Sequence, residues 1–494
     1  MHRKLTIRIL LWACFISFSF AAYAQDSPKV YVSLTFIGDV MQHGPQIKSA
    51  YNPSTDLHDY YTCFRKISPS IRSSDIAIAN LELTLAGRPF SGYPTFSAPD
   101  EIALDLKKAG VDILVTANNH SLDRRKKGLE RTIQMLDSFD IQHTGTFIDS
   151  AERARTYPLV IEKKGIKLAI LNYTYGTNGI PVTEPNIVNL IDTAQIHKDH
   201  LKALSMDVDA IITFVHWGYE YKSQPNNQQR SLAKMCKKWG SDMIIGSHPH
   251  VLQPSQIDDD GFLTVYSLGN FVSNQRNRYR DGGMMFNVLM EFDTVAHEHK
   301  IVESGYTLTW VYKKIVNQQP QYYVLPAVDY AHNEFISESD NKAKLKQFIS
   351  DSRILFKKYN KGAISGHIQN LPPLSSYNID KKKTRTYPIN IPQYSYRIKE
   401  KAMVEPTVIK KEKTIVSKNK TTYRIQFLAS AKKEDLSNLP VDLFPKIIKE
   451  KASEGFTRYF VGEFSSREKA LDHLKKLREG SKYKDAFLVV AKID

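Results

Sequence analysis

The sequence predicts an α/β fold built on a largely parallel β-sheet, and three observations support this prediction. Short runs of β-branched and apolar residues alternate with segments of helical periodicity between Val30 and Phe271. Five of the predicted strands end in polar residues of the kinds that bind metals. The chain has 494 residues, of which 42% are hydrophobic, and this length allows two or three domains with cores of their own.

The first 24 residues are predicted to be a signal peptide. Basic residues up to Arg8 precede an apolar segment, residues 9–20, and Ala22-Tyr23-Ala24 is typical of a cleavage site. An uncleaved membrane anchor stays open as an alternative, although the apolar segment is short for a transmembrane helix. We therefore expect an exported protein of the periplasm or the cell envelope.

The net charge of +16 is concentrated in one segment. Residues 380–420 contain twelve Lys and Arg against four Asp and Glu, a net charge of +8. Because this segment is also punctuated by proline and lacks apolar periodicity, it indicates a basic linker near an anionic surface. No nucleic-acid-binding motif accompanies the charge, so no nucleic acid is expected as a partner. We divide the chain into a signal peptide (1–24), a first domain (25–374), a linker (375–420) and a small C-terminal domain (421–494).

Two cysteines, Cys63 and Cys236, remain if the signal peptide is removed. Two cysteines do not form a disulfide framework, although they could pair in an oxidising compartment. We expect two free and buried thiols.

The first two polar strand ends offer oxygen atoms. Asp39 follows the predicted strand 30–37, where a turn or helix-cap aspartate is the alternative interpretation. Asn80 and Glu82 follow the strand 74–79 and point to the same side, since side chains alternate along a strand. A solvated strand edge is the alternative for this pair.

The third strand end offers an amide and an imidazole. The apolar strand 111–115 runs into Asn118-Asn119-His120, and Asp123 follows. Asn119 could supply an amide oxygen, His120 could act as a ligand or a general acid, and Asp123 could orient the ring. A capped loop is the alternative. The basic run that begins at Arg124 is either a solvated helix face or a receiver of an acidic substrate.

The last two strand ends offer three histidines. His216 follows the strand 209–215, with Trp217 beside it as a wall of a pocket or, alternatively, as core packing. His248 and His250 follow the strand 242–245, where a tight turn could aim both rings at one metal ion; a hydrogen-bonded turn is the alternative. In parallel sheets ligands bind at the carboxyl ends of strands, so we expect one shared site for all five ends.

Six motifs of the first domain resemble those of the CapA/PgsA family of capsule and poly-γ-glutamate biosynthesis proteins. They are G-D-x-M from Gly38, N-L-E from Asn80, N-N-H-x-x-D from Asn118, H-W-G-x-E-Y from His216, G-S-H-P-H-V from Gly246 and S-L-G-N-F from Ser267. The resemblance implies the four-layer sandwich of calcineurin-like metallophosphoesterases, with a two-metal centre in which Glu82 is the bridging carboxylate. It also implies an anionic polymer or its precursor as the substrate and a membrane-bound polymer synthase as a partner.

The resemblance and the strand ends together give the predicted site. Met41 stands at the third position of the phosphoesterase D-x-H motif in place of its histidine, and a thioether is a poor ligand, so we expect one or two divalent ions of manganese, zinc or iron. The predicted metal ligands are Asp39, Glu82, Asn119, His216, His248 and His250. The predicted catalytic residues are His120 and Asp123, and the predicted substrate-binding residues are Asn80, Trp217, Glu220, Asn270 and Arg124.

The C-terminal segment resembles a SPOR domain. Strands are expected at 423–427, 456–460 and 486–491, and the run F-V-G-E-F-S-S-R-E-K-A from Phe460 carries the resemblance. The resemblance implies binding to peptidoglycan glycan strands, for which we predict Gln426, Tyr459 and Phe464 as exposed contacts. An accessory domain of other use is the alternative.

Three functional interpretations follow. The first is an exported protein of polymer biosynthesis, anchored at the cell wall, whose metal site makes it a hydrolase or transferase of phosphoryl or amide groups. The second is a non-catalytic, polymer-binding assembly factor. The third, a nucleotide or DNA phosphoesterase, rests on fold analogy alone.

Overall fold

The computed structural model describes residues 29–362, 364–365, 422–430, 436, 442, 446–451, 457–480 and 487–491. The chain divides into two compact units, residues 1–380 and 381–494, and each is described by itself. The predicted signal peptide, the predicted linker and Cys14 lie outside the described residues. Among the described helices, none has the length and apolar composition needed to cross a membrane.

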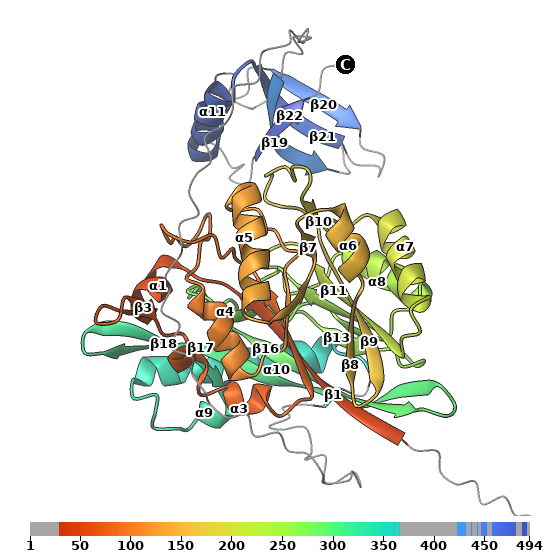
Figure 1. The fold of residues 1–494 in the computed structure, drawn as a ribbon. Helices are drawn as coiled ribbons and strands as arrows, with labels where there is room; N and C mark the ends of the chain where they lie inside the picture. The colour runs from red at the N-terminus through yellow and green to blue at the C-terminus, as the bar shows by residue number, and fades with distance from the viewer. Residues whose placement is uncertain are drawn as a thin grey trace, which may run out of the picture. The chain divides into compact units, whose positions relative to one another are not determined.

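The first unit contains an eight-stranded sheet whose order is β18-β17-β16-β1-β4-β5-β6, with β15 paired to the end of β1. Strands β18, β17, β16 and β1 of this sheet are labelled in Figure 1. Its parallel strands are β1 (Lys29–Val40), β4 (Ile76–Leu81), β5 (Ile113–Val115), β6 (Gln142–Thr144) and β15 (Asn270–Val272). Its antiparallel strands are β16 (Gly282–Asp293), β17 (Glu298–Val316) and β18 (Gln319–Pro326). The predicted parallel sheet is therefore correct for one half of this sheet only.

A second, six-stranded sheet has the order β13-β14-β12-β11-β9-β8. The four central strands are parallel: β9 (Ile166–Thr174), β11 (Ala210–His216), β12 (Met243–Ser247) and β14 (Leu263–Val265). The edge strands β8 (Leu159–Lys163) and β13 (Ser255–Ile257) are antiparallel to their neighbours.

The two sheets pack face to face, and helices cover their outer faces. Alternate residues of both sheets, such as Phe36 of β1 and Phe214 of β11, form the core between them. Helices α2 (Tyr61–Phe64), α3 (Ser68–Ile71) and α4 (Glu101–Ala109) pack on the outer face of the first sheet. Helices α7 (Thr193–Leu204) and α8 (Asn227–Lys238) pack on the outer face of the second. The predicted four-layer α/β sandwich is confirmed.

Shorter elements and two longer helices complete this unit. Helix α5 (Arg125–Ser138) packs near β6 and β7, and α10 (Ser339–Tyr359) packs on the first sheet through Leu345 and Phe348. The remaining elements are α1 (Gly44–Ala50), β2 (Tyr51–Asn52), β3 (Leu57–His58), β7 (Thr146–Phe147), α6 (Ser150–Thr156), β10 (Ile187–Val188) and α9 (Ala327–Tyr330).

The second unit is a four-stranded antiparallel sheet of order β20-β21-β19-β22 with one helix. Its elements are β19 (Thr422–Ser430), β20 (Ile447–Lys451), β21 (Thr457–Phe464), α11 (Arg467–Gly480) and β22 (Phe487–Ala491). Ile425 and Val461 of the sheet pack against Leu474 and Leu477 of α11. The sequence predicts three of these four strands; it does not predict β20, because its Lys- and Glu-rich sequence has weak strand propensity.

Candidate metal centre

The carboxyl ends of strands from both sheets carry the polar residues of one site. In the first sheet, Asp39 lies in register with Asn80 of β4 and Asn270 of β15. The register of β1 shifts between Ile37 and Asp39, and a side chain at Gly38 would come within 2.1 Å of the Gly269 carbonyl oxygen. Glycine at 38 therefore allows the close backbone approach that places Asp39 at this end of the sheet.

The first group of candidate ligands is Asp39, Glu82 and His250. The Asp39 Oδ2 atom lies 3.0 Å from Nδ1 of His250, whose Nε2 lies 3.8 Å from Oε1 of Glu82. All three residues are buried, and their candidate ligand atoms lie within 4.8 Å of one another. Two carboxylates and one imidazole are a donor set that suits a divalent transition metal.

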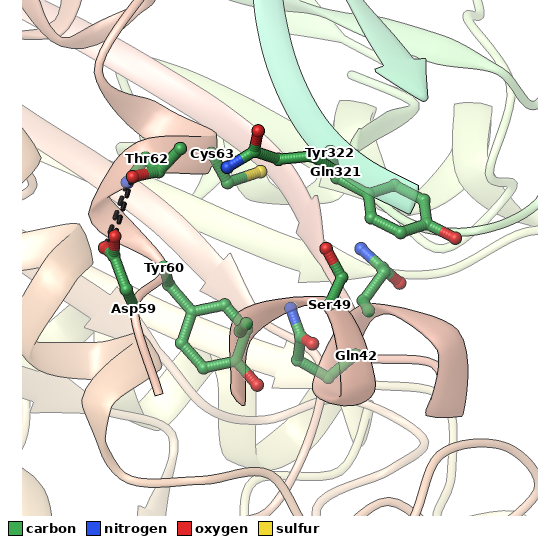
Figure 2. Close-up of a pocket in the computed structure, with 10 residues that line it drawn as sticks. Gln42, Ser49, Asp59, Tyr60, Thr62, Cys63, Gln321 and Tyr322 are labelled. Atoms are coloured by element: carbon green, nitrogen blue, oxygen red, sulfur yellow. Dashed lines mark hydrogen bonds between the residues drawn. The ribbon is translucent and has the colours of Figure 1, made fainter. Parts of the chain in front are cut away.

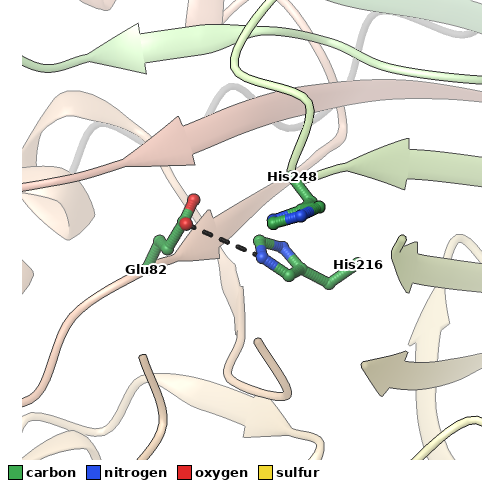
Figure 3. Close-up of side chains that lie close together, drawn as sticks. All are labelled: Glu82, His216 and His248. Carbon is green, nitrogen blue, oxygen red and sulfur yellow. Dashed lines mark ion pairs between the residues drawn. The ribbon is translucent and has the colours of Figure 1, made fainter. Parts of the chain in front are cut away.

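The second group is Glu82, His216 and His248, and Figure 3 shows the three side chains turned toward one another. The Glu82 Oε1 atom lies 3.6 Å from Nε2 of His216. The candidate ligand atoms of these three residues also lie within 4.8 Å of one another. Glu82 thus belongs to both groups, which places a carboxylate between two neighbouring donor sets.

The electrostatics of the site fit a bound cation. Oε1 of Glu82 and Nδ1 of His248 are buried and form no hydrogen bond in the described part of the chain. Burial, and then the Asp39 carboxylate, raise the pKa of Glu82 well above its usual value. Burial also lowers the pKa values of His216 and His248 well below the usual one. Because unsatisfied buried polar atoms are costly, a cation that accepts both lone pairs would compensate the desolvation.

Asparagine side chains hold the candidate ligands in place. The Asn80 amide donates to Oδ1 of Asp39 at 2.9 Å, and its carbonyl accepts from Asn118 at 3.3 Å. Asn80 is fully buried and holds Asp39 through this hydrogen bond, and its predicted role in substrate binding stays a prediction. Asn119 donates to Asn178 at 3.2 Å, which turns Oδ1 of Asn119 toward Nε2 of His216, 2.9 Å away.

His120 and Asp123 form a close pair at the third strand end. Nδ1 of His120 lies 2.7 Å from Oδ2 of Asp123, and the same oxygen accepts from the Phe96 backbone N–H at 2.6 Å. The ring of Phe96 lies 4.6 Å from that of His120. A proton held between Nδ1 and the carboxylate leaves Nε2 of His120 available for proton transfer.

The structure brings Glu220 and Asn270 to the site as well. A carboxylate oxygen of Glu220 lies within 4.8 Å of ring nitrogens of both His248 and His250. Asn270, next to Asp39 in register, donates to the carbonyl of Arg280 at 2.8 Å. Arg124 donates to the Ser91 hydroxyl, and its role toward a substrate stays a prediction.

Trp217 does not line the site, which corrects its predicted role in substrate binding. The residue is 2% exposed and packs in the core between the second sheet and its helices. Its indole N–H donates to the carbonyl of Tyr266 at 2.9 Å. Because side chains alternate along a strand, the residue after His216 faces the opposite side of the sheet.

Sequence reasoning missed several residues at the site. Tyr175 lies directly after β9 and its ring is 4.5 Å from that of His248; the same strand-end rule would have found it. Burial lowers the pKa of His43 to about 4, and the charges of His250 and His120 add to this effect, so His43 lies beside the site. Met41, by contrast, packs in the core of the first sheet's outer face and supplies no ligand.

A separate small pocket lies beside α1 and α2 (Figure 2). Its volume of about 20 Å³ suits a single water, and Oε1 of Gln42 and the Tyr60 hydroxyl are buried there without a hydrogen-bond partner among the described residues. Thr62 donates to Asp59, and burial raises the pKa of the Cys63 thiol to about 12. This pocket therefore lacks a reactive group. Cys63 and Cys236 are both free and buried, as predicted.

The three predicted glycan contacts of the second unit differ in their exposure to solvent. Tyr459 is 2% exposed and packs with Val461 against α11, so the prediction that it is an exposed contact is wrong. Phe464 is half-buried and lies 5.2 Å from the ring of His473 on that helix. The side chain of Gln426 lies outside the described residues, so its role stays a prediction.

Comparisons with known proteins agree with this arrangement. Residues 33–275 match the family described as bacterial capsule synthesis protein PGA_cap, and residues 419–490 match the SPOR domain. The PGA biosynthesis protein CapA of Bacillus subtilis (strain 168) is 28% identical over 305 residues, which cover 56% of this chain and 74% of that protein. The capsule biosynthesis protein CapA of Bacillus anthracis is 30% identical over 264 residues, which cover 49% of this chain and 60% of that protein.

Among solved structures, a phosphatase from Mycoplasma pneumoniae is similar at a TM-score of 0.35 and 15% identity, covering 57% of this chain and 94% of that one. The fold assignment rests on the two packed sheets and their helices rather than on this likeness. The family matches and the strand-end motifs lead to one conclusion. Over residues 33–275 the chain is similar to the family of bacterial capsule synthesis proteins, and over residues 419–490 it matches the SPOR domain.

Proposed function

We propose that the chain is an exported protein of capsule-type polymer biosynthesis whose first domain is a metal-dependent hydrolase or transferase. Its substrate is an anionic polymer, such as a poly-γ-glutamate-like chain, or the precursor of one. The reacting bond is a phosphoryl or an amide bond. The SPOR domain anchors the protein to peptidoglycan glycan strands, near a membrane-bound polymer synthase.

The position of Glu82 in both ligand groups carries the proposal. A buried carboxylate shared between two donor sets, with one oxygen unpaired, is suited to bridging two divalent ions. Metal bound here would polarise a phosphoryl or carbonyl oxygen and lower the pKa of a bound water. The residues that would hold the metal are Asp39, Glu82, Asn119, His216, His248 and His250.

His120 acts as the general acid or base in this proposal. Asp123 fixes the ring through Nδ1, so that Nε2 can give a proton to a leaving oxygen or nitrogen. Phe96 packs on His120 and donates its backbone N–H to Asp123, which limits the rotation of both side chains. A fixed and correctly oriented ring is what general acid catalysis needs.

The test compares the full-length wild type with His120→Ala after loading with Mn²⁺. Hydrolysis of p-nitrophenyl phosphate, bis-p-nitrophenyl phosphate and γ-glutamyl oligomers is measured together with metal content. We expect turnover of at least one substrate in the wild type and its loss in His120→Ala at unchanged metal content. The exposed His332 provides a control, since His332→Ala removes an imidazole outside the site and keeps full turnover.

Two results would contradict the proposal. Equal turnover in wild type and His120→Ala would exclude His120 from the reaction. Absence of turnover on every substrate, with polymer binding retained in both proteins, would make the chain a binding factor for polymer assembly.

A further inference from the structure

A positively charged side chain lies beside the candidate metal centre with no acidic partner. The guanidinium of Arg280 stacks 3.5 Å from the ring centroid of Tyr221. The Tyr221 ring in turn lies 6.0 Å from the ring of His250, so one aromatic ring separates Arg280 from a ligand residue. Among the ion pairs formed by described residues, none includes Arg280.

The backbone at Arg280 is fixed to the end of the first sheet. Its carbonyl accepts the Asn270 amide at 2.8 Å, and Asn270 is in register with Asp39. Its backbone N–H donates to the carbonyl of Asn277 at 3.0 Å, which closes a turn in the loop between β15 and β16. The sheet end, the turn and the Tyr221 ring therefore hold Arg280 on the side of the centre that Tyr221 covers.

A neighbouring arginine shows what a paired side chain in this loop looks like. Arg278 also stacks on a tyrosine, at 4.1 Å from the ring of Tyr279, but its guanidinium forms ion pairs with Asp281 and Asp351. Those two carboxylates neutralise its charge. Arg280 forms no ion pair with a described residue, and its planar fork of N–H donors suits a carboxylate or a phosphate.

The surroundings leave room for a substrate that extends beyond the centre. Tyr221, the ring on which Arg280 stacks, also lines a pocket of about 440 Å³ together with Arg278 and Tyr279. Arg280 itself is not among the residues that line this pocket, whose volume is within the range of ligand pockets, roughly 300–1,000 Å³. A polymer whose repeat carries regularly spaced anions would place one anion at the metal and the next one nearby. A substrate with a single anion, bound at the metal, would place no anion at Arg280.

We propose that Arg280 is the specificity-determining residue that receives a second oxyanion of the substrate, while the first lies at the metal centre. This inference rests on the proposed function. The substrate class is a molecule with at least two oxyanions in neighbouring positions, either carboxylates or phosphates. An uncharged or singly charged ester is excluded as the preferred substrate.

The test measures binding of defined probes to the full-length, metal-loaded protein by calorimetry. The two-anion probes are γ-glutamyl-glutamate, with carboxylates, and propane-1,3-diol bisphosphate; the one-anion probes are acetate and inorganic phosphate. We expect Arg280→Ala to weaken the matching two-anion probe by roughly 10–100-fold and the one-anion probes by less than about threefold. Arg280→Lys should lie in between, because it keeps the charge but loses the fork.

The control is Arg155→Ala, which removes the same charge from an exposed position of α6 and should leave the two-anion affinity within about threefold of wild type. The probe that responds identifies the source of the anion, carboxylate or phosphate. Equal binding by wild type and Arg280→Ala, or an equal loss in Arg155→Ala, would overturn the inference. Metal content is measured on every sample, so that failure of metal binding, which contradicts the proposed function, is distinguished from failure at Arg280.

Discussion

The Oε1 atom of Glu82 lies 3.6 Å from Nε2 of His216, although β4 and β11 belong to different sheets. This contact joins the carboxyl ends of the two sheets across the core of the sandwich. Neither residue is accessible to solvent, so the approach brings a carboxylate and an imidazole together in a site shielded from water. Burying these two polar groups away from water costs free energy, and a divalent cation bound between them would offset that cost.

Glu82→Gln should lose metal stabilisation without destabilising the metal-free protein. The substitution removes a buried carboxylate whose pKa is raised by burial and by Asp39. With Mn²⁺ at 100 times its dissociation constant, the wild type should gain about 2.7 kcal/mol in unfolding free energy and Glu82→Gln close to none. Thermal unfolding followed by tryptophan fluorescence measures this, because Trp217, Trp239 and Trp310 all lie in the first unit.

The exposed Glu162 provides the matched control for this experiment, and Glu162→Gln should respond to Mn²⁺ like the wild type. An equal metal response in Glu82→Gln would show that the carboxylate does not take part in binding.

Asp123→Asn should lower kcat with little change in KM. Asp123 contacts His120, not the candidate ligands, so its loss misorients the ring while metal and substrate still bind. We expect kcat to fall by up to roughly 10²–10⁴-fold, the range of general acid–base catalysis. Steady-state kinetics at fixed metal content measure kcat and KM separately.

A surface pair of the same type gives the control for Asp123. His143 lies 3.0 Å from the exposed Asp137, and Asp137→Asn should leave both kinetic constants unchanged. A rise in KM alone in Asp123→Asn would instead assign the residue to substrate binding.

Trp217→Phe should reduce stability and leave substrate affinity unchanged. The change leaves the Tyr266 carbonyl without the indole N–H in a buried site, which costs about 1–3 kcal/mol in unfolding free energy. Urea unfolding, followed by the fluorescence of Trp239 and Trp310, measures the loss. Trp239→Phe is the control for the loss of one indole fluorophore. Weaker substrate binding at unchanged stability would restore the predicted role as a pocket wall.

The His299–Asp242 pair predicts a pH-dependent contribution to stability. The Asp242 carboxylate accepts from Nε2 of His299 at 2.6 Å, and this hydrogen bond raises the pKa of His299 in the folded protein. A raised folded pKa contributes stability that is complete below the unfolded value, near 6.5, and is lost as the pH rises through the folded value. Since the pair is partly exposed, the contribution is at most about 1 kcal/mol.

The measurement compares wild type with His299→Gln by urea unfolding at several pH values. The wild type should be more stable at pH of about 5.5, and the difference should vanish above the folded pKa of His299. A difference that grows with rising pH would contradict this assignment.

One rule led to most of the candidate site: polar residues that directly follow the strands of a parallel sheet lie together at its carboxyl edge. Applying this strand-end rule needs local sequence alone. Parallel strands place their carboxyl ends at one edge, so Asp39, Glu82, His216 and His248 converge once the strands are identified. The rule could not assign Trp217, because a residue beside a ligand on a strand faces the other side. It could not find Arg280 either, since that residue comes from a loop whose position depends on the hydrogen bond with Asn270.

The antiparallel half of the first sheet and the burial of Tyr459 show a second limit. The directions of strands β16 to β18 are set by the hairpin connections that join them, and the polar strand ends of the first domain carry no information on these connections. Tyr459 has the aromatic character of a glycan contact, yet its alternation with Val461 places it on the face that α11 covers. Residue type alone does not distinguish the two faces of a small sheet.

The most direct test of the account is the metal content of the full-length protein by elemental analysis, for wild type beside Glu82→Gln. Because Glu82 is common to both of these ligand groups, we expect one or two equivalents of a divalent transition metal in the wild type and close to none in the variant. Wild-type protein that binds no metal under several reconstitution conditions, or a variant that keeps the wild-type metal content, would contradict the shared centre.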